Sequence, residues 1–132
     1  MPNEQDHLRL AEKNKHVIDF LSQKMDQFSD WVTNVAFYRA LHLVEAVFAR
    51  GNIDGRDHGN RKVILSKTTR YQKIYRHYRP LYAASRIARY LQDIDGRDYH
   101  AFSDFMSSEE VEQEILGYHL KQIEQSVEKL LQ

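Results

Sequence analysis

Apolar residues recur at intervals of three and four along nearly the whole chain, and no segment shows the strict alternation of a β-strand. This periodicity predicts helices almost everywhere. The chain has 132 residues, a length typical of one domain, and only two prolines and five glycines interrupt it. We therefore expect one domain over residues 1–132, folded as an all-α, antiparallel, up-and-down bundle of four to five helices.

The first two helices are bounded by polar residues and a Gly-Asn pair. We predict a first helix over Gln5–Gln23, and Asp30 as the N-cap of a second helix that ends at Arg50, before Gly51 and Asn52. The expected apolar face of the first helix is Leu10, Val17, Phe20 and Leu21. The expected core residues of the second are Phe37, Leu41, Val44 and Phe48.

The remaining helices follow the glycine-rich loop 51–59. We predict a short helix over Asn60–Thr68 and a longer one over Thr69–Leu91, with a kink or break near Tyr78–Arg79 because Pro80 removes a backbone hydrogen bond. Its apolar stripe is Tyr71, Ile74, Tyr78, Leu81, Ser85 and Ala88. A turn at Asp95-Gly96 follows.

The last helix is predicted to start at a capping box formed by Ser107 and Glu110, and to run to the C-terminus. Its expected buried side is Val111, Ile115, Tyr118, Ile123, Val127 and Leu130.

Charge is distributed very unevenly. The segment Arg56–Leu91 holds ten basic residues and one acidic residue, although the net charge of the chain is zero, and it also holds five tyrosines. Such a face suits a polyanion with stackable bases, because cations contact phosphates and rings contact bases. Alternatively the block pairs with the acidic segment 92–132. The exposure of four cations separates the alternatives: Arg70, Lys73, Arg76 and Arg79.

A polar stripe borders the core of the second helix. Asn34, Tyr38, His42 and Glu45 follow one another at spacings of four, four and three, and so share a face. A half-buried carboxylate needs a cationic or hydrogen-bonding partner. We expect Glu45 to pair with Arg89 or Arg86 of the basic helix, either as an ion pair that fixes helix register or as part of a polar pocket between the two helices. The expected rim of that pocket is His42, Tyr38, His58 and Arg61.

His58 and Arg61 lie at the start of the predicted third helix, where a helix N-terminus beside a cation favours phosphate; an ordinary solvated cap is the alternative. His42 and Glu45 could ligate a metal from one helix, but no full set of residues has metal-ligand spacing, and no cofactor fingerprint occurs. We expect neither a metal nor a cofactor.

Several of these segments together resemble the HEPN superfamily of small bacterial and archaeal proteins. The resemblance lies in the helix Asp30–Ala46, in His58-x-x-Arg61, and in the segment from Tyr78 to Tyr90 that contains Leu81, Ser85-Arg86 and Arg89. It implies an up-and-down helical bundle that forms a homodimer. Many members are metal-independent RNases or toxins, whereas others are nucleotide-binding or interaction modules without catalysis.

The RNase members carry an arginine followed, after four to six residues, by a histidine. Arg70-x6-His77 is the match in this chain. The resemblance implies that His77 would act as acid or base on a ribose 2′-hydroxyl and that Arg70 would stabilise the charged phosphorane. His58 with Arg61, in reversed order, is the alternative catalytic set.

Three functional hypotheses follow. The first is an RNA- or nucleotide-binding bundle, with metal-independent RNase or toxin activity as one form of it. The second is a non-catalytic dimeric module that acts through a protein partner in a toxin–antitoxin or defence pair. The third is a ligand pocket formed by Tyr38, His42, Glu45, Ser85, Arg86 and Arg89.

The location of the protein is predicted from what the sequence lacks. The chain has no cysteine, no apolar run of membrane length and no signal peptide, so we expect a cytoplasmic protein without a membrane span.

Overall fold

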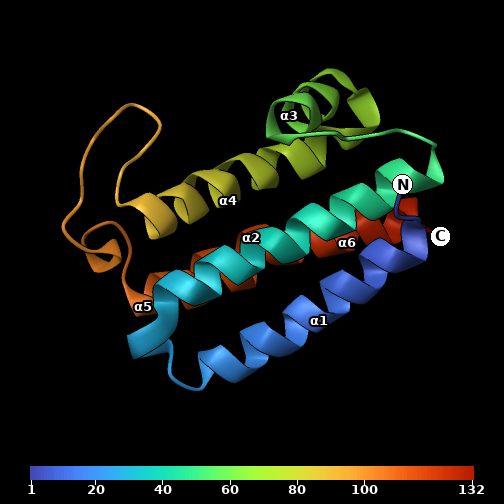
Figure 1. Ribbon diagram of the computed structural model, residues 1–132. Helices are drawn as coiled ribbons and strands as arrows, with labels where there is room; N and C mark the ends of the chain where they lie inside the picture. The colour runs from blue at the N-terminus through green and yellow to red at the C-terminus, as the bar shows by residue number, and fades with distance from the viewer.

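The computed structural model describes residues 1–132 and is all-α (Figure 1). Four rods run alternately up and down, as expected for an antiparallel bundle. They are α1 (Glu4–Ser22), α2 (Met25–Arg50), α4 (Gln72–Tyr90) and a C-terminal rod of three consecutive segments, namely α5 (Ser108–Glu110), the π-helical η3 (Val111–Leu120) and α6 (Lys121–Leu130). The connections hold α3 (His58–Lys67) and two 3₁₀ turns, η1 (Thr69–Tyr71) and η2 (Phe102–Asp104). None of these helices combines the length and apolar character of a membrane span.

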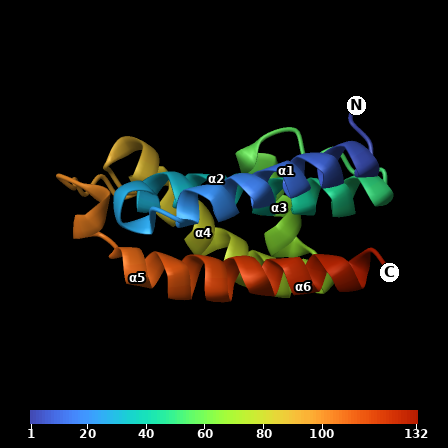
Figure 2. The ribbon, with the colours of Figure 1, turned by 90° about the horizontal axis from the view of Figure 1, so that it is seen from below.

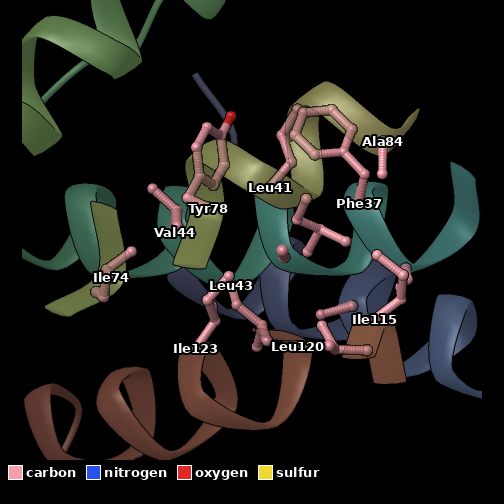
Figure 3. Close-up of a cluster of buried hydrophobic side chains, with 14 of the residues drawn as sticks. Phe37, Leu41, Leu43, Val44, Ile74, Tyr78, Ala84, Ile115, Leu120 and Ile123 are labelled. Carbon is pink, nitrogen blue, oxygen red and sulfur yellow. The ribbon is translucent and has the colours of Figure 1, made fainter. Parts of the chain in front are cut away.

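The central helix is α2, which packs against α1, α4 and the C-terminal rod (Figures 1 and 2). The four core residues predicted for this helix are confirmed as buried. Figure 3 shows how Phe37, Leu41 and Val44 of α2 meet Tyr78 of α4 and Ile123 of α6 in one apolar cluster. Removing such side chains from water is the main force that holds the bundle together.

Side-chain caps fix three helix starts. Asn3 and Asp6 form a capping box at α1, and the Asp57 carboxylate accepts a hydrogen bond from the backbone N–H of Asn60 at α3. The predicted box of Ser107 and Glu110 is present at α5. Each cap satisfies backbone N–H groups that have no partner within the helix.

Two predicted helix boundaries differ in the structure. Helix α2 begins at Met25 rather than after Asp30, with non-helical backbone angles at Phe28 where the axis bends. Of the kink or break expected near Tyr78–Arg79, the break is absent, because α4 continues through Pro80. The buried stripe of α4 keeps its helical phase on both sides of this proline, so packing on α2 holds the helix together despite the missing N–H.

The apolar face predicted for α1 is right in part. Val17 and Leu21 are half-buried, but Leu10 and Phe20 are 43% and 71% exposed, and Ala11 and Ile18 are buried instead. The small Ala11 side chain lets α2 approach closely, and the Arg39 guanidinium of α2 donates to the Ala11 carbonyl oxygen over 2.7 Å. Close approach of α2 therefore sets the buried face of α1.

In the last helix, Tyr118 was predicted to be buried but is half exposed. The cause is η3, whose π-helical backbone joins residues five apart and so rotates later side chains relative to an α-helix. Regular spacing from Ile115 would turn His119 and Gln122 inward. The π segment turns Leu120 and Ile123 inward instead, and both are buried.

Candidate functional site

The buried carboxylate of Glu45 pairs with Arg61, not with Arg89 or Arg86 as predicted. The Arg61 Nη1 lies 2.9 Å from Glu45 Oε1, and these side chains are only 9% and 14% exposed. Gly55 makes room for this pair, because a Cβ there would lie 2.3 Å from Glu45 Oε1. The loop between α2 and α3 thus brings Arg61 against α2, and this is the contact that helical periodicity does not reveal.

Arg61 also fixes the protonation of His58. The Nη2 of Arg61 lies 3.0 Å from His58 Nδ1. A guanidinium can only donate, so Nδ1 must accept and the proton of the neutral ring must lie on Nε2. Burial is the main cause that lowers the pKa of His58, and the positive charges of Arg61 and Arg89 lower it further. His58 is therefore a neutral hydrogen-bond donor.

This geometry changes the roles predicted for His58 and Arg61. The only lone pair of the neutral His58 ring faces Arg61, so His58 has no free basic nitrogen for a substrate hydroxyl. Arg61 is buried and is already bonded to Glu45 and His58. The N-terminus of α3 is capped by the Asp57 carboxylate, which does not favour the phosphate expected there.

The structure does not bring Arg70 and His77 together. Arg70 is exposed on η1, where its Nη2 donates to the Tyr71 hydroxyl over 3.0 Å. His77 is buried against the C-terminal rod, with Nδ1 3.0 Å from Nδ1 of His119 and its ring edge-on to Tyr118. The 3₁₀ turn before Gln72 interrupts the single helical register that would have aligned the two.

The residues of the proposed pocket between α2 and α4 are dispersed. The Tyr38 hydroxyl accepts from Arg89 Nη1 over 3.0 Å, and His42 stacks on His7 of α1, with their Nδ1 atoms 3.1 Å apart. Ser85 is buried and donates to the Tyr82 carbonyl oxygen. Burial is the main cause that lowers the pKa of His42. The Tyr38–Arg89 contact thus joins α2 to α4, and the His42–His7 contact joins α2 to α1.

The basic face of α4 is open to solvent. Four cations that separate the sequence-based alternatives are exposed, and none lies in an ion pair: Arg70, Lys73, Arg76 and Arg79. Within the acidic segment 92–132, Glu124 pairs with Arg39 of α2 instead, with Arg39 Nε 2.7 Å from Glu124 Oε2. The acidic C-terminal segment therefore does not neutralise this face.

Beside this face lies a groove of about 330 Å³ between α3 and α4. Its aromatic lining is His58, Tyr75, Tyr78 and Tyr82, and its cations are Lys62, Arg79 and Arg86. Burial raises the pKa of Tyr78, although Arg61 opposes that shift. Ile94, from the loop after α4, completes the lining. The sequence shows these tyrosines within the basic block but does not place them in a groove. Their spacing is the signal that could have revealed it, because residues three and four apart share one face of a helix: Tyr75, Tyr78 and Tyr82.

A second, smaller cavity of about 220 Å³ has Arg61 in its wall. His7, Glu45 and Arg61 line it together with Ile53 and Arg56 of the loop. The structure contains no group of three or more His, Asp or Glu side chains arranged to hold a metal ion. Comparison of the chain with family models, with curated proteins and with solved structures gave no match.

Proposed function

We propose that this protein binds single-stranded RNA along the basic face of α4 without cleaving it. The observation that carries the proposal is the set of exposed, unpaired cations from Arg70 to Arg79, next to a groove lined by tyrosines. Cations at the surface attract the phosphate backbone of any strand, and aromatic rings favour strands whose bases are unpaired.

Binding without cleavage follows from the two histidine sets. His58 offers a donor rather than a base, and His77 is buried on the side of α4 that faces the C-terminal rod. Neither ring is placed to take a proton from a ribose hydroxyl on the basic face. We therefore assign nucleic-acid binding to the basic face and no catalytic role to either histidine set.

The test is fluorescence anisotropy with a labelled RNA dodecamer of mixed sequence, at several salt concentrations. The four cations from Arg70 to Arg79 should contribute about −2.8 to the slope of log Kobs against log[salt], because each contact to a single strand contributes about −0.7. In the variant Lys73→Gln/Arg76→Gln the slope should shrink by about 1.4, since two cations are lost.

The matched control is Lys121→Gln/Lys129→Gln, which removes two exposed lysines from α6 and should leave the slope unchanged. The RNA should remain full length on a denaturing gel, with or without EDTA. Affinity that does not respond to salt, or that responds equally to both double variants, would contradict binding along α4.

A further inference from the structure

The groove between α3 and α4 has a shape and lining that the basic face alone does not need. Tyr75 and Tyr82 lie seven residues apart in α4, two helical turns on the same side, and both are half-buried. The centroid of the His58 ring at the start of α3 lies 5.2 Å from that of the Tyr82 ring, so the two rings are in contact. Rings from α3 and α4 therefore line the same groove.

Three cations line the groove and are available to the phosphates of a bound strand. Lys62 of α3 and Arg79 and Arg86 of α4 line it, and no ion pair involves any of them. The Nε of Arg86 is buried and has no hydrogen-bond partner within the protein. A buried donor without a partner costs free energy, and an acceptor supplied by a ligand would satisfy it.

Two further groups lack a partner within the fold. The ring of His58 has only its Nε2–H left to offer, since Nδ1 accepts from Arg61. Ile94 is 69% exposed although it lines the groove. A flat ring with acceptor atoms on its edge would accept a hydrogen bond from His58 Nε2–H. The face of the same ring would cover the apolar side chain of Ile94.

We infer that this groove holds unpaired bases of the bound RNA, stacked against Tyr75 and Tyr82, with Lys62, Arg79 and Arg86 on the adjoining phosphates. This inference rests on the proposed function and adds to it a subsite for the bases. From Tyr75 to Arg86 the groove follows α4 for about 16 Å, at about 1.5 Å per residue. At about 3.4 Å per stacked nucleotide, that length holds no more than about five nucleotides.

An acidic peptide would use the same cations but would leave the rings without stacking partners. A nucleobase uses both features, because every base presents a π-face to an aromatic side chain. The combination of rings, cations and a neutral donor therefore favours RNA over an acidic protein as the occupant.

The experiment compares a mixed-sequence RNA dodecamer with an abasic dodecamer of the same length and charge. The wild-type protein should bind the base-bearing strand at least about tenfold more tightly, as expected when one or more bases stack. The variant Tyr75→Leu/Tyr82→Leu should lose that preference while its affinity for the abasic strand and its salt dependence stay unchanged. Tyr118→Leu, which replaces a half-exposed tyrosine outside the groove, is the matched control and should behave as wild type.

Because Tyr82 also packs edge-on to Phe37, its replacement could unfold the protein, so a second measurement uses the unaltered chain. Dodecamers carrying 4-thiouridine are photo-crosslinked to the wild-type protein, and the modified peptides are mapped by mass spectrometry. Crosslinks at Tyr75, Tyr82 or His58 are expected. Crosslinks found only outside the groove would overturn the assignment.

The failures of the two proposals are distinguishable. Salt-dependent binding that is equal for base-bearing and abasic strands would overturn the base subsite and leave binding along α4 intact. Binding to neither strand would remove both. A polyglutamate of equal charge that binds as tightly as the dodecamer would overturn the assignment to RNA and identify an acidic protein surface as the occupant.

Discussion

Arg61 is the central residue of a buried polar cluster between α2 and α3. Its guanidinium bonds to the Glu45 carboxylate and to His58 Nδ1, and only 8% of the residue is exposed. A buried ion pair contributes little compared with two well-packed apolar side chains, but a single partner left alone is an uncompensated charge in a medium that solvates it poorly.

This asymmetry gives a prediction for the pair. Arg61→Met should lower the free energy of unfolding by about 3–5 kcal/mol, because Glu45 would remain buried without a partner. The double variant Arg61→Met/Glu45→Met should recover much of that loss. Urea unfolding followed by circular dichroism measures both quantities.

The control for this prediction is Arg9→Met, which removes an exposed pair with Asp6 on α1. Exposed pairs of this kind contribute less than about 1 kcal/mol. Equal losses for Arg61→Met and for the double variant would show that the loss comes from packing of the arginine stem rather than from the unpaired carboxylate.

At the scale of elements, η3 allows the apolar residues before and after it to face the core together, which a regular α-helix would not allow. Val111 and Ile115 are four apart, whereas Ile115 and Leu120 are five apart, and all three are buried. One extra residue between Ile115 and Leu120 would rotate every later side chain by about 100° in an α-helix. The π-helical backbone absorbs that residue and returns Ile123 and Val127 to the core.

The consequence is testable by deletion. Removing Gly117 should convert η3 to an α-helix with the same buried residues, so the free energy of unfolding should change by less than about 1 kcal/mol. Removing Gln125 from α6 should cost more than about 3 kcal/mol, because Val127 would turn away from the core. Urea unfolding compares the two deletions, and a larger loss for the Gly117 deletion would contradict this account of η3.

The sequence predicts the elements better than their contacts. Apolar spacing was sufficient for the number and order of the long helices and for the core residues of α2, and the local Ser-x-x-Glu motif was sufficient for the capping box at Ser107. The Glu45–Arg61 contact needs the space left by Gly55, and His77 is buried against η3, which is distant in sequence. Both are set by tertiary packing, which a periodic pattern does not encode.

At the scale of the whole molecule, histidine pairs join helices that are distant in sequence. His7 and His42 connect α1 to α2, and His77 and His119 connect α4 to η3. Burial is the main cause that lowers the pKa of His42, His77 and His119. Within each pair, one ring nitrogen donates and the other accepts, so at least one neutral ring is required.

These shifts predict the response of the fold to acid. A histidine with a lowered pKa binds fewer protons when folded, so its contribution is complete above about pH 6.5 and is lost as the pH falls from there through the folded pKa. The free energy of unfolding should therefore decline between pH 7 and pH 5. Urea titrations at pH 7.5, 6.5 and 5.5 measure the decline.

Single substitutions test whether the decline in the free energy of unfolding comes from the two histidine pairs. His42→Gln and His77→Gln should each make the decline shallower, whereas His100→Gln, which replaces an exposed loop histidine, should not alter it. If the free energy of unfolding declined as steeply in His42→Gln and in His77→Gln as in wild type, the decline would arise from groups other than these histidines.

Arg61 connects the groove to the smaller cavity, because it lines the cavity and bonds to a residue that lines the groove. The smaller cavity includes Arg61 and Glu45 in its wall, and the groove includes His58, which Arg61 holds in one tautomer. We expect that a small molecule that drew Arg61 toward the cavity would free His58 Nδ1 and so change the hydrogen bonding available in the groove. Thermodynamic linkage makes such an effect mutual, so RNA bound in the groove would alter the affinity of the cavity by the same factor. One arginine side chain is the structural connection between the two sites.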